Sequence, residues 1–122
     1  MTNLLVRAVR GATTCGNNDA DEIAVATREL LIAMLEGNDI GIEDIISVFF
    51  TTSPDLTAAF PAAAARGIGF ETVPLICSSE IDVPNAKSRC IRVMMHTYSS
   101  RERDEIRHVY LRDAQNLRDD LR

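Results

Sequence analysis

The chain has 122 residues, of which 46% are hydrophobic and 25% are charged, so its composition is that of one globular domain spanning residues 1–122. This length excludes a multidomain enzyme and leaves little room for a deep private cleft. The formal net charge of −5 argues against nucleic acid or an anionic membrane surface as the main partner.

Arginine dominates the basic residues, because twelve of the thirteen are Arg and only Lys87 is lysine. One interpretation is a genome that favours arginine codons. The other is recognition of planar anions, since a guanidinium forms a two-pronged pair with a carboxylate that an ammonium group cannot form. The basic residues also concentrate in residues 61–122, where ten stand against nine acids. Anion-binding groups are therefore expected mainly from this half, with Arg7 and Arg10 as exceptions.

The three cysteines, Cys15, Cys77 and Cys90, form no C-x-x-C pair and have no histidine at metal-ligand spacing. We therefore expect free thiols in a reducing compartment. The N-terminus lacks the apolar segment of a signal peptide, and no apolar run reaches the roughly 18 residues of a membrane span. These features predict a cytoplasmic protein with no membrane partner.

The first third of the chain predicts a strand followed by a long helix. Residues 4–9 are apolar and β-tolerant, which is typical of a short strand. Asp19 is expected to cap the helix, with Glu22 three residues on. Apolar residues then recur at helical spacing as far as Leu35, and Gly37 stands where a terminal glycine would end the helix.

The middle of the chain predicts further strands around a short helix. Residues 45–52 are β-branched and aromatic, apolar on both faces, and indicate a buried central strand. An alanine-rich stretch then predicts a short helix that begins near Pro61 and runs to Arg66. Two more strands are expected at 70–78 and 90–98, separated by a polar loop.

Arg92 stands out in the strand expected at 90–98. The alternation places it on one face with Cys90, Met94 and His96, which is mostly apolar company for an arginine. Such a position predicts a specific task or a buried partner. The tail from 99 to 122 fits both a helix and a short strand, and periodicity does not decide between them.

Taken together, the elements predict an α+β or α/β domain in which one mixed β-sheet is packed by one long helix. One face of that sheet would then lack cover. Packing against further copies of the chain would cover it, so we expect a homo-oligomer.

The sequence gives little support to covalent or metal chemistry. It has no nucleophile elbow and no P-loop, and residues 67–69 are only a fragment of a dinucleotide fingerprint. His96 and His108 could serve a cysteine nucleophile, although nothing in their spacing places them beside one. Each polar group near a strand end, taken singly, also reads as a surface ion pair or a satisfied core group. These groups are Arg10, Arg66, Cys77, Glu80, Arg92 and Tyr110.

Several short strings give these groups a common context. The most specific are RGATT at 10–14, CIRVMM at 90–95 and IRHVYL at 106–111. Others occur in order between them: SPDL at 53–56, AFPA at 59–62, Val73-Pro74, Cys77 and EIDV at 80–83. Over nearly its whole length, the chain resembles the trimeric, mixed α/β class of monofunctional chorismate mutase.

The resemblance implies a fold, an assembly and a reaction. The sheets of three subunits would form a pseudo-α/β-barrel trimer with sites between neighbouring subunits. The reaction would be the Claisen rearrangement of chorismate to prephenate in aromatic amino acid biosynthesis, which needs no nucleophile, cofactor or metal. Negative charge grows on the ether oxygen in the transition state, so a fixed cation beside that oxygen raises the rate.

The resemblance also implies roles for individual residues. Arg92 would be the cation beside the ether oxygen. Arg10 and Tyr110 would hold the enolpyruvyl carboxylate and keep the substrate in its reactive chair form. Glu80 and the region of Cys77 would bind the ring hydroxyl and the ring edge. The remaining substrate-binding residues, with Arg66 and Arg118 near the mouth of the pocket, are Phe60, Ala62, Arg66, Ile76, Leu117 and Arg118.

Two positions depart from the pattern of the relatives. Ala63 stands where a lysine often follows the Phe-Pro-Ala string, and Ile76 stands where a polar residue often precedes the cysteine. One peripheral cation and one hydroxyl are therefore missing, so substrate affinity is less determined than reaction type. The alternative function is a non-catalytic trimer that binds carboxylated metabolites, and a third hypothesis makes Cys77 or Cys90 a nucleophile.

Overall fold

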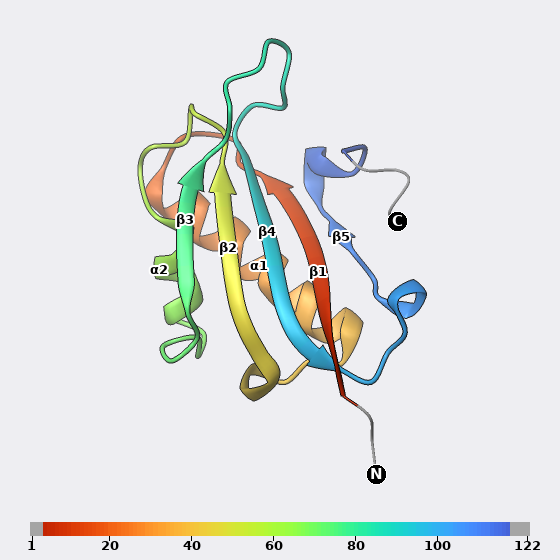
Figure 1. Cartoon of the computed structure of the whole chain (residues 1–122). Coiled ribbons are helices and arrows are strands. Elements are labelled where there is room, and N and C mark those ends of the chain that lie inside the picture. Colours follow the sequence, from red (N-terminus) through yellow and green to blue (C-terminus); the bar gives the residue numbers. More distant parts are fainter. Residues whose placement is uncertain (1–3, 118–122) are drawn as a thin grey trace.

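A single five-stranded mixed sheet organises the molecule (Figure 1). This computed structural model describes residues 4–117. The strand order is β3-β2-β4-β1-β5, with β4 antiparallel to both β1 and β2, while β2 pairs in parallel with β3 and β1 with β5. The predicted α+β class with a mixed sheet is thereby confirmed. The strands are β1 (Leu5–Thr14), β2 (Ile45–Thr52), β3 (Leu75–Ser79), β4 (Cys90–Ser99) and β5 (Val109–Tyr110).

The long helix α1 (Ala20–Asn38) begins as predicted. The Asp19 carboxylate accepts a hydrogen bond from the backbone N–H of Glu22 at 3.0 Å, which satisfies one of the free donors of the first turn. The predicted end at Gly37 is wrong, because the helix continues to Asn38 and Asp39 takes the left-handed conformation with φ of 53°. Aspartate is one of the few residues besides glycine that visits this region readily.

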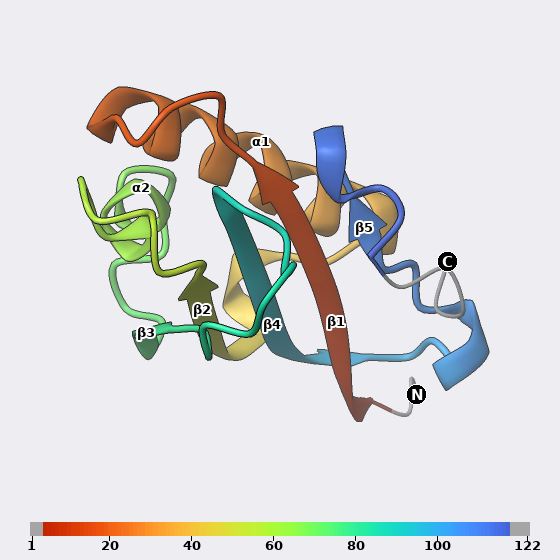
Figure 2. The ribbon, with the colours of Figure 1, turned by 90° about the horizontal axis from the view of Figure 1, so that it is seen from above.

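Both helices lie on the same side of the sheet (Figure 2). The short helix α2 (Pro61–Arg66) begins at Pro61 as predicted, with the proline in its first turn, where a missing N–H costs nothing. α1 approaches β1 closely at Gly11, because a Cβ there would lie 2.5 Å from the Met34 sulfur. The core between helices and sheet includes fully buried Leu30, Met34, Phe50 and Met95.

The two faces of the sheet differ sharply, as the alternation along β4 shows. Met95 and its odd-numbered neighbours on β4 are buried against the helices, whereas Arg92 and His96 lie on the opposite, open face and are only half-buried. Phe49, on the same open face of β2, is 49% exposed. The expectation that β2 is buried on both faces is therefore wrong for the open face. No element among residues 4–117 covers that face (Figure 2).

The boundaries of three other elements also depart from the sequence-based expectation. β1 runs on through the RGATT string to Thr14, because β4 pairs with it along its full length. β3 begins only at Leu75, since Phe70 and Val73 enter the core from turns. In the described part of the tail, a strand is correct only for the two residues of β5, and short 3-10 helices form at Arg103–Glu105 and Arg112–Ala114.

Candidate active site

A cavity of about 410 Å³ opens on the uncovered face of the sheet, between β4 and the ends of β1, β2 and β5. This volume suits one small ligand, since single-ligand pockets measure roughly 300–1,000 Å³. The cavity brings together residues from both halves of the chain. It is lined by Arg10, Gly11, Ala12, Phe49, Thr51, Glu80, Arg92, Val93, Met94, His96, Tyr110 and Leu117.

Arg92 and Glu80 face one another across this cavity. The Nε atom of Arg92 lies 3.8 Å from Oε2 of Glu80, and about a third of each side chain is exposed. The same carboxylate oxygen accepts a hydrogen bond from the hydroxyl of Thr51 on the neighbouring strand. Glu80 follows directly after β3, where its own N–H bonds to the carbonyl of Thr52 at 2.8 Å. Both the backbone and the side chain of Glu80 are thus fixed against β2.

The cavity wall holds buried polar atoms that have no hydrogen-bond partner. Five such side-chain atoms occur among residues 4–117, and three of them line this one cavity: Arg92 Nε, Tyr110 Oη and His96 Nδ1. The contact of Arg92 Nε with Glu80 is too long for a hydrogen bond. Because buried polar groups are almost always paired, this cluster leaves three polar atoms available to a ligand that enters the cavity.

The tail places Tyr110 beside Arg10. β5 pairs with β1 through only two residue pairs, and the N–H of Leu111 bonds to the carbonyl of Ala12 at 2.9 Å. Just before β5, Nδ1 of His108 accepts a hydrogen bond from the N–H of Arg10 at 3.0 Å. The IRHVYL string therefore has a structural part, which ties the tail to β1, and a cavity-lining part in Tyr110.

The SPDL string holds the beginning of β4 in place next to Arg92. The Ser53 hydroxyl accepts a hydrogen bond from the N–H of Cys90 at 2.8 Å, and the Asp55 carboxylate accepts from the N–H of Arg89 at 3.0 and 3.1 Å. Ser53 also donates to Asp55, and this hydrogen bond, with those from Arg89, lowers the pKa of the Asp55 carboxyl. The carboxylate is therefore kept in its accepting, charged form.

Cys90 precedes Arg92 by two residues on β4 and interacts with its guanidinium. Burial raises the pKa of the Cys90 thiol, and a hydrogen bond and the positive charge of Arg92 offset part of this rise. A raised pKa keeps the thiol protonated, whereas a cysteine nucleophile needs the thiolate. The hypothesis that Cys90 acts as a nucleophile thus finds no support in its surroundings.

Five of the residues implied by the family resemblance line the cavity, namely Arg10, Glu80, Arg92, Tyr110 and Leu117. Five others do not. Phe60 is 73% exposed at the start of α2, Ile76 is 59% exposed on the open face of β3, and Arg66 is exposed at the end of α2. The side chains of Ala62 and Cys77 pack against the core on the helix side of the sheet. Arg118 lies outside the described residues.

The structure adds residues that the sequence analysis did not propose for the site. Phe49 and Thr51 reach the cavity from β2, and their membership depends on the register of β2 against β4. Met94 and His96 were within reach of sequence reasoning, because they share the face of Arg92 by simple alternation. His96 also makes an edge-to-face contact with Phe49, with ring centroids 5.8 Å apart.

Within residues 4–117, no group of three acidic, histidine or cysteine side chains is placed to hold a metal ion. Nor does any described helix combine the length and apolar character that crossing a membrane requires.

Comparison with known proteins gives concordant results. The family model described as chorismate mutase type I matches residues 6–121. The chain is 48% identical over 118 residues to the chorismate mutase AroH of Thermus thermophilus, covering 96% of this chain and 97% of the relative. It is 40% identical over 119 residues to the chorismate mutase AroH of Bacillus subtilis (strain 168), covering 97% and 94% respectively.

A solved structure agrees with these sequence matches. The chorismate mutase from Clostridium thermocellum superposes with a TM-score of 0.87 at 50% sequence identity, over 88% of this chain and 96% of that chain. The match therefore extends over most of the fold described above. On sequence and structure together, the chain belongs to the type I chorismate mutase family, and its activity is that of an isomerase.

Proposed function

We propose that chorismate binds in the cavity on the open face of the sheet and rearranges there to prephenate. The observation that carries this assignment is the pair of unpartnered buried atoms, Arg92 Nε and Tyr110 Oη, in one cavity of about 410 Å³. One is a donor on a cation and the other a hydroxyl, and together they suit a ligand with several oxygen atoms.

Arg92 acts on the transition state in this proposal. As the ether C–O bond breaks and the new C–C bond forms, negative charge grows on the ether oxygen. A guanidinium already in place beside that oxygen stabilises the transition state more than the bound substrate, which is the condition for raising kcat. Glu80 and Thr51 support this role, because the carboxylate holds the arginine across the cavity and is itself held by the hydroxyl.

Arg10 and Tyr110 position the substrate. Arg10 makes no ion pair with any residue among 4–117, so its guanidinium is available to a carboxylate of the ligand. With Tyr110 it binds the enolpyruvyl carboxylate and restricts the flexible substrate to the reactive chair form. The Glu80 carboxylate accepts a hydrogen bond from the ring hydroxyl.

An assay of the purified chain tests the assignment. Chorismate is added, and its loss is measured as a decrease in ultraviolet absorbance. We expect turnover well above the uncatalysed rate, and prephenate as the product. Binding of chorismate in calorimetry without turnover would instead support a carboxylate-binding protein, the alternative function, and would overturn the assignment.

We further propose that three copies of the chain form the working enzyme. Apolar side chains on the open face support this, because Val6, Phe49, Ile76 and Tyr98 are each between 47 and 59% exposed. Phe60 also supports it, since its exposed ring does not reach the cavity of its own chain. When a neighbouring copy covers the open face, the first chain would contribute residues to the site of that neighbour. These are Phe60, Ile76, Arg66 and the backbone around Ala62 and Cys77.

The three free thiols support a reducing, cytoplasmic setting.

Substitution at the open face tests the assembly. Ile76→Glu places a charge on that face and is expected to shift the protein from trimer to smaller species in sedimentation velocity, with loss of activity. Ile32→Glu is the matched control, because Ile32 is an equally apolar, 43% exposed residue on α1. Equal behaviour of the two variants would contradict the proposal.

Mixing two inactive variants tests the shared site. Phe60→Asp puts a carboxylate against the dianionic substrate, and Arg92→Lys disables the cation. If each site takes Arg92 from one copy and Phe60 from the next, refolding the two variants together rebuilds about one quarter of the sites. Mixtures that stay as inactive as either variant would show that both residues serve one chain's own site.

A further inference from the structure

A second and larger cavity runs along the edge of β1, next to the candidate site. Its volume of about 1430 Å³ exceeds the range of roughly 300–1,000 Å³ for single-ligand pockets, so it is an open cleft rather than a second reaction chamber. It exists because β5 pairs with only two residues of β1, Gly11 and Ala12, and leaves the outer edge of that strand before Gly11 without a neighbouring strand. The two cavities share four lining residues: Arg10, Met94, His96 and Tyr110.

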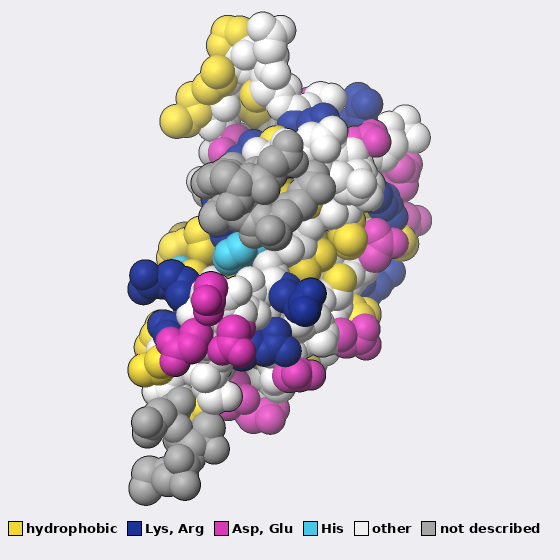
Figure 3. Space-filling view, turned by 90° about the vertical axis from the view of Figure 1, so that its right-hand side faces the viewer, with side chains coloured by type: hydrophobic (Ala, Val, Ile, Leu, Met, Phe, Trp, Pro, Cys, Tyr) yellow, Lys and Arg dark blue, Asp and Glu magenta, His cyan; other side chains and the backbone are white. Residues whose placement is uncertain are grey.

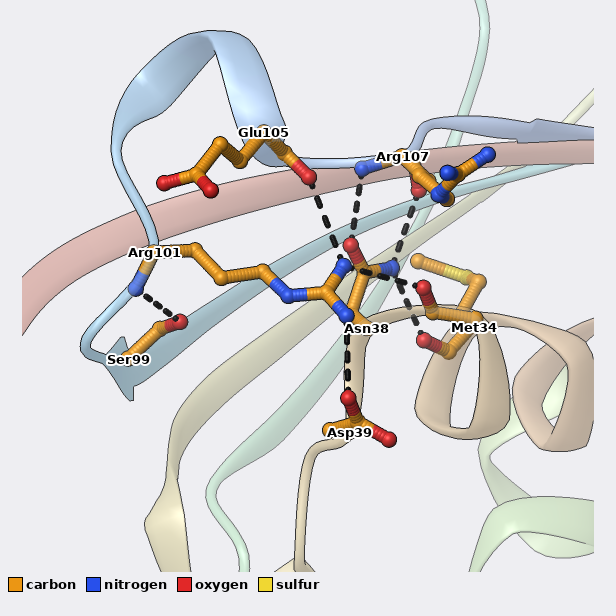
Figure 4. Close-up of polar contacts among 8 residues, drawn as sticks. Met34, Asn38, Asp39, Ser99, Arg101, Glu105 and Arg107 are labelled. Carbon is orange, nitrogen blue, oxygen red and sulfur yellow. Dashed lines mark hydrogen bonds and ion pairs between the residues drawn. The ribbon is translucent and has the colours of Figure 1, made fainter.

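One wall of this cleft is the segment 101–107, which is tied to the end of α1 (Figure 4). The Asn38 amide donates to the carbonyl of Arg107 at 2.9 Å and accepts from its N–H at 2.7 Å. The Arg101 guanidinium donates to the carbonyls of Gly37 and Glu105 and pairs with Asp39 at 3.0 Å. Arg7 on β1 also donates to the carbonyl of Arg101 at 3.0 Å, so the wall is held at both sides of the cleft.

Charge on the cleft wall is opposite in sign to that of the whole chain. Five arginines line the cleft against two acidic residues, although the chain carries a formal net charge of −5. Figure 3 shows this side of the molecule, on which Arg side chains gather among acidic ones. Arg7 and Arg101 are already paired, with Glu102 and Asp39. Among residues 4–117, by contrast, Arg103 and Arg107 are exposed and form no ion pair.

We propose that this cleft is an outer capture surface for the anionic substrate, in which Arg103 and Arg107 attract the dianion by charge and pass it to Arg10 and Tyr110. The inference rests on the proposed function, because it takes its ligand from the neighbouring cavity. An excess of one sign of charge along a cleft raises the local concentration of an oppositely charged ligand, and here the lining arginines outnumber the lining acids. The net negative charge of the protein repels a dianion, so a local excess of positive charge is needed to speed the association of the substrate with the site.

Coulomb's law sets the size of the effect. One unit charge and a dianion roughly 15 Å apart in water attract enough to change a rate about twofold at about 10 mM ionic strength, where the Debye length is about 30 Å. Both arginines together should therefore change kcat/KM about threefold. At about 1 M salt the Debye length falls to about 3 Å, and the effect disappears.

Steady-state kinetics over a series of salt concentrations tests the proposal. We expect the double variant Arg103→Gln/Arg107→Gln to have kcat/KM about threefold lower at about 10 mM salt, with kcat maintained and the difference lost at high salt. The corresponding double Lys variant should match the parent, because attraction at this range depends on charge and not on guanidinium geometry. Arg28→Gln is the matched control, since it removes one arginine from α1 outside both cavities.

Three results would overturn the capture role. These are a salt dependence equal to that of the Arg28→Gln control, a deficit that persists at high salt, and a fall in kcat. Failure of the proposed function looks different, because the parent enzyme itself would then show no turnover of chorismate at any salt concentration.

Discussion

The two faces of β4 show how one strand serves stability on one side and chemistry on the other. On the helix side, Ile91, Val93 and Met95 are at most 3% exposed and pack with α1. On the open side, Arg92 and His96 each hold a buried nitrogen without a partner. The side with satisfied contacts stabilises the fold, and the side with unsatisfied polar atoms remains available to a ligand. Substitutions on the two faces should therefore separate stability from activity.

The largest effect is expected from Arg92→Lys on the open face. A lysine keeps the charge but cannot reproduce the planar guanidinium, so kcat should fall about 10³-fold. The melting temperature should barely change, because the side chain packs no core. Steady-state kinetics and thermal unfolding measure the two quantities. A variant that turns over like the parent would show that Arg92 does not stabilise the transition state.

Met95→Ala on the covered face should do the opposite. Removal of this fully buried side chain leaves a cavity against α1, which should lower the free energy of unfolding by about 3 kcal/mol. Urea denaturation measures the change. Met94→Ala is the matched control on the open face, where the side chain is half-buried, and it should cost about 1 kcal/mol or less. Equal losses for both variants would contradict the contrast between the faces.

Asn38→Ala tests the hydrogen bonds that tie the segment 101–107 to the end of α1, which we call the clasp. The buried amide makes three hydrogen bonds, two with the backbone of Arg107 and one with the carbonyl of Met34. Truncation leaves the backbone N–H and carbonyl of Arg107 without these partners and should cost about 2 kcal/mol in urea denaturation. The exposed amide of Asn17, with one side-chain contact to Glu22, provides the control, and Asn17→Ala should cost less. If the two costs agree, the clasp does not contribute as described.

Asp19→Ala should give the smallest change, about 1 kcal/mol, because it removes only the cap of α1. Asp19→Asn retains an oxygen that accepts the same hydrogen bond, and it should restore most of the loss in thermal unfolding. A loss as large for Asn as for Ala would indicate that charge at the helix end, and not the hydrogen bond, is the stabilising factor.

Local patterns predicted most of the fold. Helix capping at Asp19, Pro61 at the start of α2 and the β-branched run of β2 all depend on neighbours in sequence, and all three hold. The tail and the limits of β3 could not be predicted, because they depend on pairing with distant segments. Tyr110 is a strand residue only because β1 lies beside it. Likewise, β3 cannot start before Leu75 because Phe70 is drawn into the core under α2.

The site was predictable to the extent that it follows one strand. Alternation alone marked Arg92 as a cation among apolar neighbours, whereas its role, like those of Arg10, Glu80 and Tyr110, came from the family resemblance. Phe49 and Thr51 required the register of β2 against β4, which no local pattern supplies. The sequence also could not show that Phe60 and Ile76 lie outside the cavity of their own chain. Their positions depend on which strand forms the edge of the sheet.

The close approach of α1 to β1 at Gly11 bears on how such proteins are recognised. Within the string RGATT, Arg10 lines the cavity, whereas Gly11 makes room for the Met34 side chain. Selection for folding alone would preserve the glycine in a descendant that no longer rearranges chorismate. A diverged or engineered chain could therefore keep much of the family signature and have lost the reaction. Whether such a chain has kept the activity is better judged from Arg10, Arg92 and Tyr110 than from the length of the motif it shares with the family.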